Sequence, residues 1–527
     1  MTMVTTTRTR RLLFWFWAAV AGVVSAAVFL ATAELVALLV AREGSPILAV
    51  GGFVIDIVPQ PFKEFAIATF GEYDKIALLA GLGLAVLVAS AVAGILQFLK
   101  PPLGIVALIV AGGLSVAAIV TRAGATPLAS LPPIAGTIAG CGVLWFLVSR
   151  LRRWASERPA VHPNGVPVPA SVDRRMFFRI AAIAGASAVV VGVGARALIN
   201  ATASSISAVR TALKLPAPRT RVAIPEGAEL DIPGISPLFT PNADFYRVDT
   251  ALTVPAIDPA TWRLVIDGMV DQRVELTFDE LVGMGLDEYA ITLTCVSNEV
   301  GGQLLGNALW LGIPVREVLK LAGPTSGADM VLSRSVDGFT ASTPLDSLTD
   351  DGLDAILAVG MNGEPLPVEH GFPVRMVVPG LYGYVSATKW LTELKVTTFA
   401  ADEAYWTPRG YSATAPIKFS SRIDTPRTGT PVSAGSVPLA GVAWAQTVGI
   451  DRVEVSIDEG DWQPATLSSP INDDTWVQWV VEWDAAPGPH YVAVRAVDKN
   501  GELQIEERAP IAPDGSTGWQ RTLVNVT

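Results

Sequence analysis

The strongest constraint on how this chain folds is the uneven distribution of its apolar residues. A helix needs ~20 predominantly apolar residues to cross the ~30 Å hydrocarbon core of a bilayer. Five stretches before residue 200 meet that requirement: Leu12–Val40, Ile76–Leu99, Leu103–Val120, Leu131–Val148 and Ile180–Ile199. The rest of the 527 residues carries no such run and is interrupted by proline and glycine. The sequence therefore predicts a membrane region of five transmembrane helices over residues 1–200, followed by a soluble body.

The arginines predict the orientation of these helices, because positively charged residues collect in the loops on the cytoplasmic side. Arginines precede the first stretch and fill the loop between the fourth and fifth: Arg8, Arg10, Arg11, Arg150, Arg152, Arg153, Arg158, Arg174, Arg175 and Arg179. The loop from Arg42 to Lys75 holds more acidic than basic residues. An inside N-terminus and five crossings predict a multi-pass protein of the cell membrane, in contact with the lipid bilayer, with its C-terminal region extracytoplasmic.

A pair of arginines stands directly before the fifth stretch, in Asp173-Arg174-Arg175-Met-Phe-Phe-Arg179. The segment resembles the twin-arginine export motif, with Asp173 where Ser or Thr is usual. The apolar residues that follow are rich in Ala and Gly, as in such signals. An ordinary cytoplasmic basic cluster is the alternative. Twin-arginine export moves folded proteins, which would suit a protein that receives a large cofactor before export.

The soluble body divides into segments of different pattern. Residues 201–220 contain Ser-Ser-Ile-Ser and Pro-Ala-Pro-Arg and predict a linker. Residues 221–425 alternate short strands and helices, which indicates an α+β domain. The expected elements are strands at Thr261–Ile266, Ala290–Thr294, Ala355–Val359 and Arg375–Val378, and helices at Phe278–Gly283 and Pro314–Leu321.

Residues 426–527 show alternating apolar and polar positions with turn signals between the runs. The expected strands are Val437–Trp444, Val453–Asp458, Thr475–Trp483 and His490–Val497. An all-β, immunoglobulin-like sandwich is the natural interpretation. The formal net charge of −11 disfavours nucleic acid as a partner, because a phosphate backbone attracts positive surfaces.

One cysteine carries most of the chemical information. The chain has two cysteines, and Cys141 lies within the fourth apolar stretch. Cys295, at the end of the β-branched run Ile291-Thr-Leu-Thr, therefore has no disulfide partner on its own side of a membrane. A thiolate is a soft metal ligand and a nucleophile. A buried free thiol is the plain alternative.

Several spaced motifs around Cys295 resemble the sulfite oxidase family of molybdopterin enzymes. They are Cys295-Val-Ser297-Asn298, Gly306-Asn-Ala-Leu-Trp-Leu-Gly-Ile-Pro314, Leu366-Pro-Val-Glu-His370-Gly-Phe-Pro-Val-Arg375, Val378-Pro-Gly380 and Lys389-Trp390. Phe245-Tyr246 and Trp262-Arg-Leu-Val-Ile-Asp-Gly268 match the entry strands of the family. The resemblance covers about 280 residues and nothing before about residue 225.

The resemblance implies a molybdenum-molybdopterin cofactor with Cys295 as the metal ligand and catalytic residue. It also implies residues that contact the pterin or its phosphate: Asn242, Phe245, Tyr246, Arg247, Asp337, His370, Arg375, Ser386, Thr388 and Lys389. Arg375 suits the phosphate because a guanidinium pairs bidentately with it. Ser386 and Thr388 would donate to phosphate oxygens. The resemblance further implies a homodimer formed through the C-terminal sandwich.

The sequence departs from sulfite oxidases directly after the cysteine motif. That family places a pair of arginines after Asn, one of which helps to bind the sulfite anion, whereas here Asn298 is followed by Glu299 and Val300. A carboxylate repels a dianion. A small neutral acceptor such as an S-oxide or N-oxide is therefore expected ahead of a sulfite-like substrate.

The histidines bear on electron transfer. The three are His162, His370 and His490, none in a predicted transmembrane stretch, and no Cys-x-x-Cys-His motif is present. Electrons are therefore expected to pass to or from an external electron-transfer partner. The alternatives are a cofactor-free, degenerate binding module on a membrane scaffold, a true sulfite oxidase, and a cysteine hydrolase with Cys295 as nucleophile and His370 as base.

Overall fold

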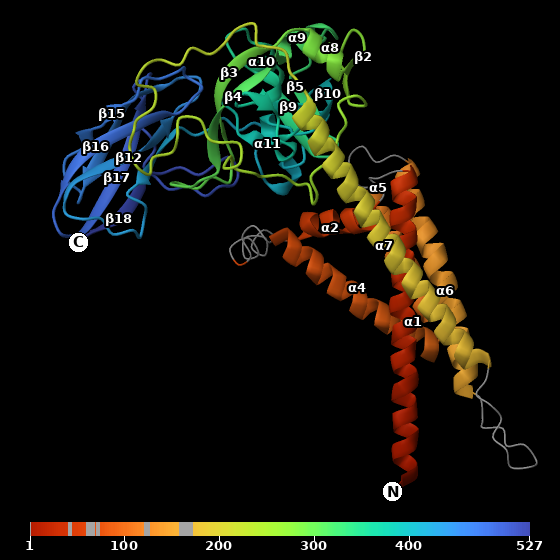
Figure 1. The fold of residues 1–527 in the computed structure, drawn as a ribbon. Helices are drawn as coiled ribbons and strands as arrows, with labels where there is room; N and C mark the ends of the chain where they lie inside the picture. Colours follow the sequence, from red (N-terminus) through yellow and green to blue (C-terminus); the bar gives the residue numbers. More distant parts are fainter. Residues whose placement is uncertain (1, 41–44, 59–68, 70–73, 121–126, 157–171) are drawn as a thin grey trace, which may run out of the picture. The chain divides into compact units, whose positions relative to one another are not determined.

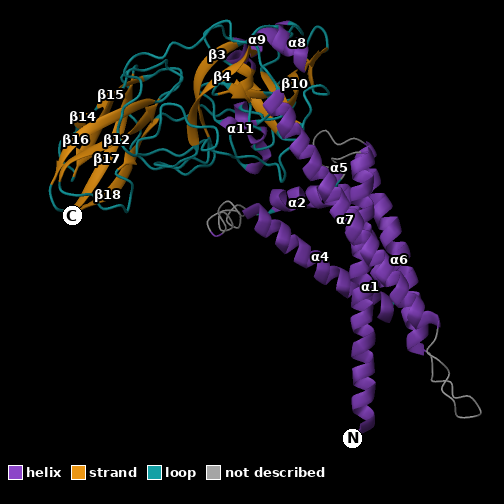
Figure 2. Ribbon diagram, in the orientation of Figure 1, coloured by secondary structure: helices purple, strands orange, loops and turns teal. Residues whose placement is uncertain are grey.

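The computed structural model describes residues 2–40, 45–58, 69, 74–120, 127–156 and 172–527. His162, Arg158 and much of the loop between Arg42 and Lys75 lie outside these residues. The chain forms two compact units, one of residues 1–204 with 250–253 and one of residues 205–249 with 254–527. Among the described residues, every strand lies after residue 262 (Figure 2).

The first unit is helical (Figure 1). Its elements are α1 (Thr2–Val40), α2 (Pro46–Ile57), α4 (Asp74–Leu99), α5 (Leu103–Val120), a short 3-10 turn at Pro127–Ser130, α6 (Leu131–Ser156) and most of α7 (Val172–Ala212). Five segments are long and apolar enough to cross a membrane: Arg10–Val40, Ala77–Leu99, Leu103–Val120, Pro127–Ser156 and Arg174–Gly194. The five expected apolar helices are therefore present, with ends shifted by several residues.

Small residues let these helices approach closely. A Cβ atom on Gly22 of α1 would lie 2.0 Å from the carbonyl oxygen of Ser90 in α4. One on Gly94 of α4 would lie 2.1 Å from the carbonyl oxygen of Ala18 in α1. In a lipid bilayer the hydrophobic effect does not drive helices together. Close van der Waals packing, which glycine permits, contributes to their association instead.

The expected linker over residues 201–220 is only partly correct, because α7 continues to Ala212. Residues 201–212 contain no proline, and the helix accommodates Thr202 and Thr211, whose hydroxyls donate to the carbonyls of Leu198 and Ser207. The chain becomes irregular before Pro216 and Pro218, which cannot continue a helix. The serine-rich composition predicted a linker. Hydroxyl bonds within the helix and the packing of Ile206 against the α+β domain favour a helix instead.

The second unit begins with an α+β domain built on two sheets. One has the order β2 (Val274–Thr277), β1 (Arg263–Gly268), β10 (Leu391–Thr397), β5 (Met330–Ser335) and β6 (Thr340–Pro344), with β1 and β10 parallel. The other has the order β3 (Asp287–Thr294), β4 (Leu305–Pro314), β7 (Ile356–Met361) and β8 (Glu364–Pro365), and β9 (Arg375–Val377) also pairs with β7. The short helices α8 (Phe278–Gly283), α9 (Val315–Lys320), α10 (Leu345–Thr349) and α11 (Gly383–Ser386) complete the domain, with 3-10 turns at Val368–His370 and Thr407–Arg409.

The core of this domain explains the apolar runs in the sequence. β7 is buried on every residue, and Leu264, Leu357 and Leu394 from three strands pack in one hydrophobic cluster. The helix expected at Phe278–Gly283 is present with those bounds and has a capping box between Thr277 and Glu280.

The C-terminal part is a sandwich of two antiparallel four-stranded sheets. One has the order β11 (Ser420–Thr425), β12 (Gly435–Trp444), β16 (Val477–Ala485) and β15 (Thr466–Leu467). The other has the order β14 (Gln463–Pro464), β13 (Ile450–Ile457), β17 (Gly488–Asp498) and β18 (Gln520–Val526). Their inward residues share one core, which includes Trp479 and Trp483. β11 already pairs with β12, so the sheet begins at Ser420, ahead of the expected boundary at 426.

Hydrogen bonds tie the sandwich to the α+β domain within this unit. The backbone nitrogen of Thr292 donates to the carbonyl of Asp474 at 3.0 Å, and Trp476 N donates to the Thr292 hydroxyl at 2.9 Å. The buried Arg422 of β11 donates to the carbonyl of Gly302 at 2.9 Å and pairs with Asp424 at 2.6 Å. The loop after β3 is therefore held from both domains.

Candidate active site

Cys295 lies at the end of β3, in a tight turn. Its backbone nitrogen donates to Leu304 O at 2.9 Å, and its carbonyl accepts from Asn298 N at 3.0 Å. The side chain is buried, and the Ser297 backbone N–H points at its Sγ atom at 3.4 Å. Burial raises the pKa of the Cys295 thiol, and the Ser297 contacts oppose that rise. A thiol in this state is inert unless a metal displaces its proton.

Three aromatic side chains, Phe245, Tyr246 and Trp310, cluster against the strand that ends directly before Cys295. The Phe245 ring stacks on Tyr246 with 5.3 Å between centroids and meets Trp310 edge-on at 5.9 Å. Burial raises the pKa of the Tyr246 phenol, with a further rise from Cys295 and an opposing effect of Arg375. Tyr246 therefore lies within electrostatic reach of both the thiol and the guanidinium.

Arg375 is a buried cation with weak compensation. Its nitrogens donate to three backbone carbonyls at 3.2 to 3.4 Å, those of His370, Met376 and Ala387, and its guanidinium lies 5.2 Å from the centroid of the Trp310 ring. Among the residues that the structure describes, no carboxylate pairs with it. Burial lowers the pKa of Arg375 to about 10. Such a charge is costly without an anion, so this position suits a bound phosphate.

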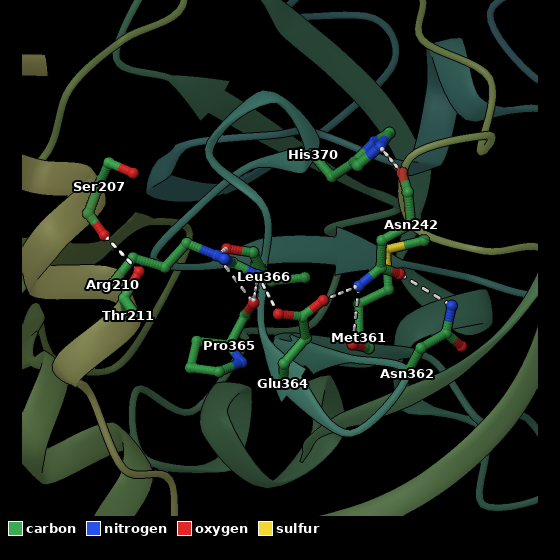
Figure 3. Close-up of polar contacts among 10 residues, drawn as sticks. All are labelled: Ser207, Arg210, Thr211, Asn242, Met361, Asn362, Glu364, Pro365, Leu366 and His370. Carbon is green, nitrogen blue, oxygen red and sulfur yellow. Dashed lines mark hydrogen bonds and ion pairs between the residues drawn. The ribbon is translucent and has the colours of Figure 1, made fainter. Parts of the chain in front are cut away.

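His370 lies beside Arg375 and is buried. Its Nε2 atom lies 3.2 Å from the carbonyl oxygen of Asn242 (Figure 3). A carbonyl only accepts, so Nε2 carries the proton. Burial lowers the pKa of His370 to about 4, with smaller contributions from Arg375 and Lys389. The ring is therefore neutral at pH 7, and its Nδ1 atom is a hydrogen-bond acceptor.

Lys389 supplies the second buried cation. Its ammonium donates to Asp249 Oδ2 at 2.8 Å and to Glu369 O at 3.1 Å, and it lies 4.6 Å from the centroid of the Trp390 ring. Asp249 also accepts from Arg247 at 2.9 Å. Burial lowers the pKa of Lys389 to about 8, and Asp249 opposes that shift. One carboxylate thus faces two cations.

The other expected residues make local bonds. The Ser386 hydroxyl donates to Leu381 O and Tyr382 O, and the Thr388 hydroxyl pairs with Ser333 at 2.7 Å. Asp337 Oδ1 accepts from Phe339 N in the turn between β5 and β6. The structure therefore brings together Cys295, Tyr246, Arg375 and His370 with the neighbouring Phe245, and leaves Ser386 and Thr388 engaged with protein atoms.

Asn242 belongs to a network that the sequence did not indicate (Figure 3). Its amide nitrogen donates to Glu364 Oε1 at 2.7 Å, and its side-chain oxygen accepts from Asn362 at 2.8 Å. Glu364 Oε2 in turn accepts from Arg210 near the end of α7 at 2.9 Å. Arg210 and Glu364 are 154 positions apart, so no local pattern announces the pair. Asn362-Gly363 is a two-residue turn at positive φ, the short hairpin signal that the sequence did carry.

Thr294 was also missed. Its hydroxyl is buried, and no hydrogen-bond partner for it exists among the described residues. It precedes Cys295 directly. Within the described ranges, the Thr294 hydroxyl lacks a hydrogen-bond partner, and the Arg375 guanidinium bonds only to backbone carbonyls at 3.2 to 3.4 Å. Both groups could therefore bond to a ligand. A buried thiol and two buried cations are the chemical groups that would suit a large anionic cofactor with a metal centre.

The comparisons with known proteins agree with that class. Residues 251–406 match the family described as oxidoreductase molybdopterin binding domain. Human mitochondrial sulfite oxidase is 31% identical over 343 residues, which cover 55% of this chain and 62% of that protein. Tomato NADH nitrate reductase is 26% identical over 318 residues, covering 48% of this chain and 35% of that protein. The chain therefore contains an oxidoreductase molybdopterin binding domain and has sulfite oxidases among its relatives, and it spans less than two thirds of the length of the human relative.

Among solved structures, the sulfane dehydrogenase SoxCD of Paracoccus pantotrophus is similar with a TM-score of 0.48 and 23% identity, over 55% of this chain and 84% of that chain. The cofactor of the family is molybdenum-molybdopterin. The residues present fit this cofactor. Arg375 lacks a carboxylate partner among the described residues, and Lys389 shares its partner Asp249 with Arg247. Cys295 offers a soft metal ligand.

Proposed function

We propose that this chain is a membrane-anchored, outward-facing molybdopterin oxidoreductase that transfers an oxygen atom to or from a small substrate. The observation that carries the proposal is the burial of Arg375, which has no carboxylate partner in the described part of the chain and which, like Cys295, influences the Tyr246 phenol. A structural arginine in such a place would need a counter-ion, as Arg422 has in Asp424.

Each residue has a role in this proposal. The bound cofactor would supply oxygen-atom and electron transfer at its metal. Cys295 would hold the metal, Arg375 and Lys389 would neutralise the phosphate, and neutral His370 would accept a hydrogen bond through Nδ1. Phe245, Tyr246 and Arg247 would line the pterin, and Asn242 would orient His370. Ser386 and Thr388 would support the phosphate loop through their backbone, since their hydroxyls are engaged.

The proposed substrate is a small neutral oxide. Glu299 is exposed and Val300 half-buried, and both follow Asn298 in the loop of Cys295. The names of the relatives favour a second candidate, a sulfite oxidase. Steady-state kinetics with sulfite and with a methyl sulfoxide separate the two, because efficient sulfite turnover would refute the neutral substrate.

The proposal extends to the surroundings of the enzyme. The five apolar helices support membrane anchoring, and the arginine distribution supports an outward C-terminal region exported through the twin-arginine route. The sandwich would be immunoglobulin-like and would mediate a homodimer, which sedimentation of residues 205–527 tests. Electrons would pass to or from an external partner.

Elemental analysis of the purified full chain tests the function itself. A molybdenum-to-protein ratio near one supports the enzyme. A ratio near zero in protein made by cells that synthesise the cofactor supports the degenerate binding module or the cysteine hydrolase. A screen of oxides with an artificial electron donor then identifies the substrate.

A further inference from the structure

A loop of the sandwich reaches the turn that carries Cys295. The Ser516 hydroxyl donates to Asn298 O at 2.8 Å, three residues after the thiol. Gly515 has φ +104°, and a Cβ atom there would lie 2.4 Å from the hydroxyl oxygen of Tyr382. The Gly301 backbone packs on the Gln520 side chain in the same way, with a Cβ atom 2.9 Å away. The two loops are therefore in direct contact.

This sandwich loop carries one member of an ion pair. Asp514 Oδ2 lies 3.2 Å from Lys418 Nζ, and both side chains keep about a third of their surface exposed, 39% and 33%. The Lys418 backbone nitrogen donates to the Tyr382 hydroxyl at 3.3 Å. Pro513 O accepts from Ser412 N at 3.0 Å, so the loop is fixed on both sides of Asp514.

Tyr382 connects this ion pair to Cys295. Burial raises the pKa of Tyr382 to about 12, the Lys418 hydrogen bond opposes the rise, and Asp514 and Cys295 each add to it. The phenol therefore lies within electrostatic reach of both Asp514 and the thiol. We call three residues the charged rim: Lys418 and Asp514, which pair next to Tyr382, and the exposed Glu299, which follows Asn298 in the loop of Cys295.

An exposed ion pair of this kind contributes little to stability. Its larger effect is on the local potential, which governs whether a charged ligand approaches. The rim holds one cation, and Asp514 neutralises it, while Glu299 adds a further negative charge. The sum of the three formal charges is −1.

Resting on the proposed function, we propose that Asp514 neutralises Lys418 and so makes the approach to Cys295 selective for uncharged small substrates. The sandwich thereby determines substrate charge for the domain that binds the cofactor. Loss of the Asp514 charge would leave Lys418 free to attract a dianion, and loss of both charges would remove that attraction.

The test measures binding of sulfate, a non-reactive dianion, to the purified full chain by isothermal titration calorimetry at low ionic strength. Asp514→Asn should bind sulfate about tenfold more tightly than the unmodified protein, because one repulsive charge is lost. The double variant Asp514→Asn, Lys418→Met should return to the original affinity. The gain in Asp514→Asn should shrink at high salt.

A matched control is Glu317→Gln, which removes the acid of another exposed ion pair, Glu317 with Lys320 on α9. It should leave sulfate affinity unchanged. Unchanged affinity in Asp514→Asn, or an equal gain in the double variant, would overturn the inference. Molybdenum content, measured on the same samples, reports on the proposed function separately, since a metal-free protein would refute that function whatever its sulfate affinity.

Discussion

The Nε2 atom of His370 donates a hydrogen bond to the backbone carbonyl of Asn242 at 3.2 Å. This bond determines the tautomer of the ring and leaves Nδ1 as an acceptor. Asn242 is itself held by Glu364 and Asn362. The orientation of one buried histidine therefore depends on side chains from the hairpin of β7 and β8 and, through Arg210, on the end of α7.

The buried state of His370 predicts a pH dependence of stability. Its pKa is lowered from 6.5 to about 4 in the folded chain, chiefly by burial. Between these values the unfolded chain binds a proton that the folded chain does not, so stability falls as pH falls through this window. In a cofactor-free protein of residues 205–527, His370→Gln should remove a loss on the order of 2 kcal/mol between pH 6.5 and 4, measured by urea unfolding.

His490 is the natural control, because its shift has the opposite sign. The hydrogen bond that His490 donates to the Asp458 carboxylate raises the pKa of His490, and a second one to Ala486 O adds to the rise. Its contribution is present at low pH and is lost as pH rises through the folded pKa. His490→Gln should therefore leave the loss between pH 6.5 and 4 nearly unchanged and remove a pH dependence of stability that lies above pH 6.5. An acid loss that His370→Gln leaves unchanged would contradict the buried neutral ring.

Arg210 is predicted to be part of the folded second unit. Its guanidinium donates to Pro365 O at 2.7 Å, to Leu366 O at 2.8 Å and to Glu364. Arg210→Ala should lower the free energy of unfolding of residues 205–527 by about 2 kcal/mol, because Glu364 and two carbonyls lose a donor. Thr211→Ala, which removes only an exposed hydroxyl bonded to Ser207 O, should change it by less than about 0.5 kcal/mol. Equal effects would show that Arg210 acts only through helix propensity.

How far the sequence predicts this structure depends on the range of the contacts. Local patterns suffice for α8, with its capping box, and for the placement of Cys295 at a strand end. The continuation of α7 to Ala212 could not be predicted from composition, because Ile206 and Arg210 are stabilised by partners in the α+β domain.

The same limit applies to the site. The motif spacing in the sequence indicated Arg375, His370 and Lys389. All three side chains are buried in the structure, as expected for polar residues within apolar segments. Asp249 and Thr294 carried no local signal, since a carboxylate 140 positions from Lys389 becomes its partner only in the fold. The hydroxyls of Ser386 and Thr388 were expected at the phosphate. In the structure the Ser386 hydroxyl donates to Tyr382 O, and the Thr388 hydroxyl bonds to the Ser333 hydroxyl.

Two buried arginines offer a direct contrast. Arg375→Met should lower the molybdenum content at least tenfold, since the phosphate loses its partner. It should not destabilise the cofactor-free protein, because the charge that it removes has no carboxylate partner among the described residues. Arg422→Met should lower the free energy of unfolding by about 3 kcal/mol, because the buried Asp424 then lacks its cation and keeps only the hydrogen bond from Ser236 N. Differential scanning calorimetry measures the stability of each variant, and metal analysis measures its molybdenum content. A cofactor-free Arg375→Met protein less stable than Arg422→Met would contradict the role of Arg375 as a phosphate ligand.

The twin arginines predict a route of export. Arg174→Lys together with Arg175→Lys keeps the charge of the loop but removes the motif. The second unit should then remain in the cytoplasm, protected from protease added outside intact cells. Arg152→Lys with Arg153→Lys, near the end of α6, should leave the second unit accessible. Digestion of the second unit in the first variant would exclude the twin-arginine route.

We expect Cys295 to bind molybdenum, and the metal itself offers the most direct test. X-ray absorption at the molybdenum edge counts the sulfur atoms bound to the metal in the purified full chain and in Cys295→Ser. We predict that molybdenum in the unmodified protein has one more sulfur ligand than molybdenum in Cys295→Ser. Circular dichroism should show that the variant keeps the fold of the unmodified protein. An identical sulfur count in the two proteins would contradict the assignment of Cys295 as the metal ligand.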